Sequence, residues 1–151
     1  MPDRLACTGS RLILVPFARF GRGIRYAQQW LYATYDMAMS IEPRPALAVW
    51  KQLEQATPLG HVDGTMFPAG FAHIAGSGYA SGYYGYMWSE VLALDMLSPF
   101  KKDMLDPKVG IRYRDTILSQ GGQVEEMDAV RKFLGREPSN EAFFAEIAGR
   151  R

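Results

Sequence analysis

The stretch HIAGSGYASGYYGYMWSEVLALDML, residues 73–97, changes character halfway along its length. Four glycines and four tyrosines lie between residues 76 and 86, and the remainder has the apolar spacing of a helix. Glycine loosens the backbone, whereas aromatic rings in a core need a firm one. Packing is therefore a poor account of the first half, and the stretch predicts a functional loop followed by a helix.

The composition is that of a globular protein with little net charge. The chain has 151 residues, enough for one domain or for a piece of a larger one, and 48% of them are hydrophobic. Seventeen basic residues against sixteen acidic ones leave a net charge of +1. Bulk charge therefore favours neither a nucleic acid nor a membrane surface as a partner.

Two features of the first residues bear on the cellular compartment. The apolar run LILVPFA, residues 12–18, is too short to span a bilayer and is interrupted by Pro16. Cys7 is the single cysteine, so the chain cannot form an internal disulfide. Proteins of reducing compartments are typically free of disulfides, and we expect a cytoplasmic protein with no membrane partner.

Helical spacing, together with proline and glycine, divides most of the chain into predicted helices. Apolar residues recur every three to four positions, and a helix-breaking residue follows each run. Asp106 is placed to cap a helix that has Pro107 at its first position. The predicted helices cover residues 24–39, 46–56, 84–97, 107–120, 124–134 and 140–147. No pair of segments has the alternation of strands, so the predicted fold class is all-α.

The same spacing assigns side chains to the interior or to the surface. The helix over residues 84–97 carries one broad apolar stripe and is expected to be buried. The side chains expected inside include Met87, Trp88 and Val124, and Tyr84 is also expected to be packed. His61 is expected on the surface of a loop, and the turn GREP, residues 135–138, is assigned no chemistry.

Three blocks of sequence resemble one family of enzymes. They are F-x-HI-x-G-x-GYASGYYGYMWSEVLALD (71–95), GIRYRDTILSQGG (110–122) and FLGREPSNEAFF (133–144). In this order they resemble the C-terminal end of the thimet oligopeptidase, oligopeptidase A and dipeptidyl carboxypeptidase group of zinc metallopeptidases. RYAQQWLYATYDM (25–37) resembles the preceding helix. The resemblance implies that residues 19–151 form the C-terminal helical part of a zincin-like oligopeptidase for short peptides, after an off-pattern segment, residues 1–18.

The resemblance also implies a zinc ion that this chain is not equipped to hold. In such enzymes a His-Glu-x-x-His helix and a downstream Glu bind zinc, and a metal-bound water attacks the peptide carbonyl. His61 and His73 are the two histidines here, and neither begins that motif. We therefore expect no metal ligands, no bound zinc and no hydrolysis by this chain alone. A missing N-terminal part or a separate chain would supply the zinc site.

Matched to the family, the loop of glycines and tyrosines has a chemical purpose. A neutral phenol donates a hydrogen bond and can stabilise negative charge that develops on a peptide carbonyl oxygen. Glycines let a loop approach a peptide backbone closely. The resemblance assigns catalytic contacts to Tyr86, Tyr79 and His73. It assigns substrate-binding contacts to Tyr83, Gly78 and Gly82.

Two functional hypotheses follow, and a third is disfavoured. The first is a C-terminal portion of an intracellular zinc oligopeptidase, whether a gene fragment or one of two chains. The alternative is a non-catalytic helical module that binds peptides or regulates a full-length relative. A base-stacking platform for nucleic acid needs a basic groove, yet residues 70–89 contain no Lys or Arg.

Helices separated from their usual neighbours would expose an apolar patch and favour self-association.

Overall fold

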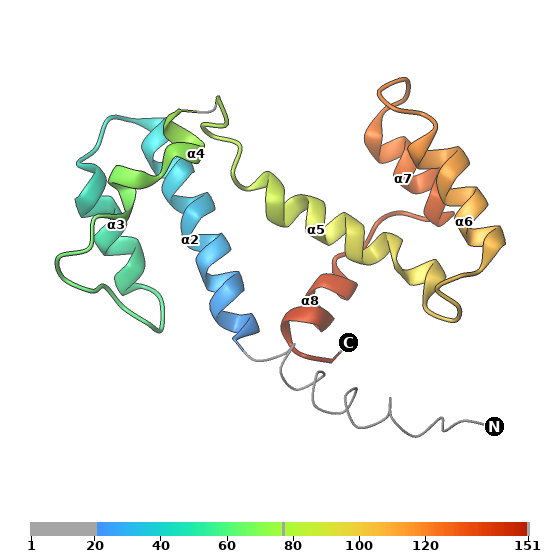
Figure 1. Cartoon of the computed structure of the whole chain (residues 1–151), viewed down its shortest axis with the longest axis horizontal. Helices are drawn as coiled ribbons and strands as arrows, with labels where there is room; N and C mark the ends of the chain where they lie inside the picture. The colour runs from blue at the N-terminus through green and yellow to red at the C-terminus, as the bar shows by residue number, and fades with distance from the viewer. Residues whose placement is uncertain (1–20, 77, 151) are drawn as a thin grey trace, which may run out of the picture. The chain divides into compact units, whose positions relative to one another are not determined.

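The computed structural model describes residues 21–76 and 78–150, and the regular secondary structure in these ranges is entirely helical, joined by turns and loops (Figure 1). Strands are absent from these ranges, which confirms the all-α prediction. No helix among them is both long and apolar enough for a bilayer span. The predicted division at residue 18 lies outside the described residues. The described residues separate into two compact units, divided between Gly85 and Tyr86.

The first unit is built on two helices joined by a proline-containing turn. Helix α2 covers Arg22–Ile41 and helix α3 covers Ala46–Gln55, close to the predicted ranges. The chain is extended at Glu42, directly before Pro43, because a residue that precedes proline is disfavoured in helical geometry. A short η1, Phe67–Gly70, and a single turn α4, Ala72–Ala75, follow the long loop after α3.

Aromatic rings fill the space between α2 and α3. The buried cluster contains Leu31, Tyr35, Val49, Trp50 and Phe71. Trp50 stacks on Phe67 with ring centroids 4.5 Å apart and meets Tyr35 edge to face at 5.3 Å. Burying a large apolar side chain contributes about 1.5–3 kcal/mol, so this cluster holds the two helices together.

The second unit contains the remaining helices. They are α5 (Gly85–Met96), η2 (Ser98–Phe100), α6 (Pro107–Tyr113), the π-helical turn η3 (Arg114–Leu118), α7 (Glu126–Leu134) and α8 (Glu141–Ile147). As predicted, the Asp106 carboxylate caps α6 by accepting the Lys108 N–H at 2.8 Å. Gly135 ends α7 in the left-handed conformation that glycine favours.

The packing centre of this unit is Phe133, whose side chain is completely buried. Its ring meets Tyr113 edge to face at 5.3 Å, and Phe100 lies 6.3 Å away. The Arg112 guanidinium lies over the Phe133 ring, 5.2 Å from the centroid. These contacts connect α6 and α7 through one aromatic side chain.

The prediction that residues 84–97 form a buried helix is wrong in its burial. Tyr84 and Trp88 are 54% and 59% exposed, and the one buried residue of α5 is Asp95. The apolar residues of α5 are spread around the helix and not gathered on one face, so its sequence does not say which face a neighbour covers. The predicted inward position of Val124 is also wrong, because α7 begins only at Glu126 and helical spacing does not apply before it.

A buried carboxylate links α5 to the turn GREP. Asp95 is 3% exposed, and its oxygens accept hydrogen bonds from the Arg136 guanidinium at 2.5 and 2.8 Å. The backbone N–H of Ser139 donates to the same carboxylate at 2.8 Å. Arg136 chiefly, with help from Ser139, holds the pKa of Asp95 below its usual range. GREP therefore has a structural role that its sequence alone did not reveal.

Replacing Asp95 tests this link. Asp95→Ala leaves Arg136 and the Ser139 N–H without their acceptor, and we expect the free energy of unfolding to fall by about 2 kcal/mol. Because the folded-state pKa of Asp95 is lowered, its stabilisation is present above the ordinary Asp pKa of about 3.9 and is lost as pH falls through the lowered value. Urea denaturation at neutral and acidic pH measures both effects.

Two variants serve as controls for this measurement. Asp95→Asn should show a weaker loss of stability with acid than the wild type, since it has no carboxylate to protonate. Asp128→Ala removes an exposed partner of Arg131, and exposed ion pairs contribute at most about 1 kcal/mol. Equal losses from Asp95→Ala and Asp128→Ala would contradict the role given to Asp95.

Candidate functional site

The loop of glycines and tyrosines is ordered by two successive turns. Gly78 has a φ of 75°, which only glycine adopts easily. The Gly82 N–H then donates to the Tyr79 carbonyl at 3.0 Å, and the Gly85 N–H donates to the Gly82 carbonyl at 3.0 Å. The second turn leads directly into the first residues of α5. Residues 78–85 therefore form two defined turns directly before α5.

Three of the predicted site residues come together in one ring cluster. The imidazole of His73 stacks on the Tyr79 ring with centroids 5.0 Å apart and planes 1° from parallel. The Tyr83 ring meets His73 edge to face at 5.3 Å. Tyr79 is 59% exposed, so this stack borders solvent. The arrangement offers an imidazole and a phenol side by side.

Tyr83 also joins this cluster to the core of the first unit. Its ring lies 5.5 Å from both Tyr32 and Phe71, edge to face in each case. Tyr83 is half-buried by these contacts. Its ring therefore supports His73, and the substrate contact that the sequence predicted for Tyr83 stays a prediction.

Tyr86 lies in the first turn of α5, in the second unit, and is 52% exposed. The neighbouring Tyr84, predicted to be packed, is exposed to a similar extent. Helical spacing placed Tyr84 on the apolar stripe, but α5 begins only at Gly85, so that spacing does not apply to it.

Gly82 is the second glycine that the turn requires. A Cβ atom at Gly82 would lie 3.2 Å from the Tyr79 carbonyl oxygen, closer than an ordinary contact. The predicted role of Gly78 and Gly82 in binding substrate stays a prediction, whereas their role in shaping the turn follows from the backbone.

A buried carboxylate that the sequence did not single out lies beneath the loop. Asp36 of α2 is 1% exposed, and its two oxygens accept the backbone N–H groups of Ser81 and Tyr83 at 2.8 and 2.9 Å. Asp36 is the single acidic residue of α2. A single acidic residue among the apolar positions of a helix was the sequence signal from which Asp36 could have been identified as a functional candidate.

The described residues do not fit a zinc ion. Catalytic zinc sites use three protein ligands, and nowhere in residues 21–76 and 78–150 do three His, Cys, Asp or Glu side chains meet as a metal would require. No step that uses a metal is therefore assigned to these residues.

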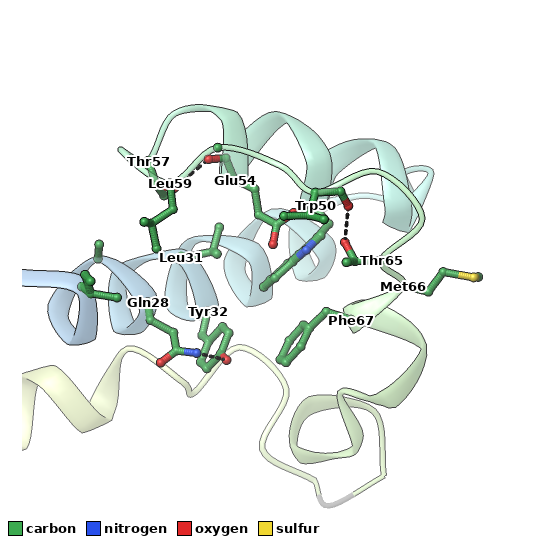
Figure 2. A pocket seen from close by; sticks show the side chains of 14 residues that line it. Gln28, Leu31, Tyr32, Trp50, Glu54, Thr57, Leu59, Thr65, Met66 and Phe67 are labelled. Atoms are coloured by element: carbon green, nitrogen blue, oxygen red, sulfur yellow. Dashed lines mark hydrogen bonds between the residues drawn. The ribbon is translucent and has the colours of Figure 1, made fainter. Parts of the chain in front are cut away.

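The first unit also contains an apolar pocket of about 650 Å³ (Figure 2). Figure 2 shows the rings of Tyr32, Trp50 and Phe67 grouped at its centre, and Tyr32 and Phe67 stack with centroids 5.0 Å apart. The other lining residues are Ile24, Ala27, Gln28, Leu31, Glu54, Thr57, Leu59, Gly60, Val62, Thr65 and Met66. The volume falls in the range of small-ligand pockets.

His61 lies close to this pocket and is not the surface residue that the sequence predicted. Its side chain is 6% exposed, and Nδ1 lies 2.5 Å from the Glu54 carboxylate. The loop after α3 folds back toward that helix, as the Lys51–Asp63 ion pair at 3.1 Å also indicates. The contact between His61 and Glu54 could not be predicted from helical spacing, because His61 lies in a loop.

Gly78→Ala tests the loop geometry. An alanine at a φ of 75° costs about 1–2 kcal/mol in the left-handed region, so the turn before Tyr79 should open or change shape. We expect the His73 and Tyr79 ring signals in NMR spectra to shift. Gly85→Ala is the matched control, because nothing lies within 4 Å of its new Cβ. The geometry would be refuted if neither variant moved the ring signals.

Comparisons with known proteins give the chain its family. The model of Peptidase family M3 matches residues 24–149. Saccharolysin of Saccharomyces cerevisiae is 46% identical over 101 residues, which are 65% of this chain and 14% of that protein. Oligopeptidase A of Escherichia coli is 36% identical over 124 residues, which are 76% of this chain and 18% of that protein.

A third relative has a different activity in its name. Dipeptidyl carboxypeptidase of Escherichia coli is 41% identical over 69 residues, 45% of this chain and 10% of that protein. The chain thus spans less than a fifth of the length of each of these three relatives. The family match includes the ring cluster, the buried carboxylates and parts of both units, and the chain belongs to Peptidase family M3.

Proposed function

We propose that this chain provides the substrate-facing loop of a zinc-dependent oligopeptidase that hydrolyses short peptides. The residues that bind zinc would lie outside this sequence, in another part of the enzyme or in a separate chain. The chain alone is then expected to be inactive. Its single cysteine supports a reducing, cytoplasmic setting, and nothing in its charge suggests a nucleic acid or a membrane as partner.

The observation that carries the proposal is the solvent-facing stack of His73 on Tyr79. These rings are parallel at 5.0 Å, with His73 in the single turn α4 and Tyr79 in the glycine-containing loop, where an exposed aromatic residue needs a reason. The family match includes this loop, and two of the relatives, oligopeptidase A and dipeptidyl carboxypeptidase, are named as peptidases. A peptide is therefore the class of ligand best supported for it.

The chemistry available at the loop is hydrogen-bond donation. The phenol of Tyr79 can donate to a peptide carbonyl oxygen and would donate more strongly once that oxygen gains negative charge. Tyr86 offers a second exposed phenol, and the imidazole of His73 can donate or accept according to its tautomer. Gly78 and Gly82 bring the backbone close to a ligand without side chains in the way, and Tyr83 supports the imidazole from below.

The apolar pocket supports the second candidate, a non-catalytic module that binds peptides. Its volume of about 650 Å³ and its aromatic lining suit an apolar side chain (Figure 2). Several apolar residues at this pocket are well exposed, namely Ile24, Leu59, Val62 and Met66. This candidate needs peptide binding that does not depend on the tyrosine loop, which separates it from the first.

Tyrosine-to-phenylalanine variants test the role of the loop. Tyr79→Phe and Tyr86→Phe each remove one phenolic donor, and we expect each to weaken the binding of a labelled short peptide roughly fivefold, or about 1 kcal/mol. Fluorescence anisotropy of the purified chain gives the affinity. Tyr84→Phe is the control, an equally exposed tyrosine with no assigned contact. Binding that all three variants retain, but that Leu59→Asp at the pocket abolishes, would favour the second candidate.

Metal content and peptidase activity test the proposal that the zinc ligands lie outside this sequence. The purified chain should hold far less than one zinc ion per molecule by atomic emission, and it should not cleave a quenched fluorescent peptide. A genomic His-Glu-x-x-His motif just upstream, in any reading frame, would support the proposal. Stoichiometric zinc together with chelator-sensitive cleavage would refute it.

A further inference from the structure

Asp36 is buried in α2, yet both of its carboxylate oxygens are used by the tyrosine loop. Oδ1 accepts the Ser81 N–H at 2.8 Å, and Oδ2 accepts the Tyr83 N–H at 2.9 Å. None of the salt bridges among residues 21–76 and 78–150 includes Asp36. The loop's backbone therefore supplies the hydrogen bonds that compensate this carboxylate for leaving water.

An uncompensated charge in this position would destabilise the fold. Burying a carboxylate costs several kcal/mol unless good hydrogen bonds satisfy its lone pairs. Hydrogen bonds from backbone N–H groups to a carboxylate are charge-assisted and stronger than neutral ones. An apolar side chain at this buried helix position would avoid the cost of removing a charge from water. The presence of a carboxylate is therefore explained by its hydrogen bonds to the loop.

What Asp36 holds is a strained turn. Ser81 has a φ of 60°, and it is the one described non-glycine residue with a positive φ. The left-handed conformation costs about 1–2 kcal/mol for such a residue. Ser81 is also the residue whose N–H is bound by Oδ1. The hydrogen bond therefore offsets a conformation that the free chain would avoid.

The turn sets the positions of the rings on either side of it. Tyr79 begins the turn, and its carbonyl accepts the Gly82 N–H. Tyr83 follows the turn, and its N–H is the second group bound to Asp36. Because the Tyr83 ring meets His73 edge to face and His73 stacks on Tyr79, a shift of Tyr83 would disturb the whole cluster.

We propose that Asp36 is a positioning residue that orients the His73–Tyr79 pair by holding the turn over residues 79–83. It touches neither substrate nor reacting atoms and acts through the loop. The value of this orientation for binding a peptide rests on the proposed function above. The orientation itself is a property of the free chain and can be measured without any ligand.

Asp36→Asn is the main test, because it keeps the shape of the side chain. Asparagine can accept one N–H through its oxygen, but its amide group faces the other N–H as a second donor. We expect hydrogen exchange of the Ser81 and Tyr83 amides to accelerate roughly tenfold or more. The ring-current-shifted His73 signals should move toward those of an unstacked imidazole. If peptide binds through the loop, its affinity should fall roughly fivefold or more.

Two further variants separate positioning from general damage. Asp63→Asn, an exposed carboxylate of the same unit, should leave the amide exchange and the His73 signals unchanged. Ser81→Asn introduces a residue that tolerates a positive φ, so the double variant Asp36→Asn, Ser81→Asn should recover part of the His73 shift. A general loss of stability would show no such recovery.

The outcomes distinguish the two proposals. Unchanged exchange and unchanged His73 signals in Asp36→Asn would overturn the positioning role, whatever happens to peptide affinity. Changed signals without recovery in the double variant would also overturn it, since the strained turn would then not be what Asp36 holds. If the wild-type chain binds no peptide, the proposed function fails, and the NMR measurements alone decide the role of Asp36.

Discussion

The pair of hydrogen bonds from a buried carboxylate of α2 to the tyrosine loop is the constraint on which the candidate site depends. Asp36 joins segments 45 and 47 residues apart in the chain, at Ser81 and Tyr83. The second unit uses the same device, because Asp95 joins α5 to residues 41 and 44 positions later, at Arg136 and Ser139. In both units a charge inside a helix fixes a turn that the helix itself does not contain.

The sequence was sufficient for whatever is decided by neighbouring residues. Helices α2 and α3 lie near their predicted limits because Pro43, Pro45 and Pro58 exclude helical geometry locally. The cap at Asp106 and the terminating Gly135 follow from the same short-range chemistry. These signals, added to the absence of strand alternation, gave the all-α class. The family emerged from ordered blocks of sequence and not from any single residue.

Contacts between distant segments could not be predicted in this way. Periodicity identifies a face that could be buried, but not whether another segment covers it, and so Trp88 was placed inside although it is exposed. The same limit hid the contact of His61 with Glu54 and that of Asp95 with Arg136, because each joins a helix to a segment without regular spacing. In the candidate site the rings could be named from sequence, whereas the hydrogen bonds of Asp36 to Ser81 and Tyr83 could not, because they join distant segments.

The π-helical turn η3 has a consequence for how the segment GIRYRDTILSQGG is interpreted. Its Ser119 N–H bonds to the Arg114 carbonyl five residues back, so one extra residue is accommodated in that turn. An α-helix advances by about 100° per residue, and the extra residue therefore rotates everything after it relative to everything before. Ile111 lies in α6, before this rotation, and Thr116 lies within η3, so their directions around the helix axis do not follow one 100° periodicity. A single helical-wheel projection of residues 110–122 therefore assigns some residues to the wrong face. The residues before η3 and those after it need separate projections.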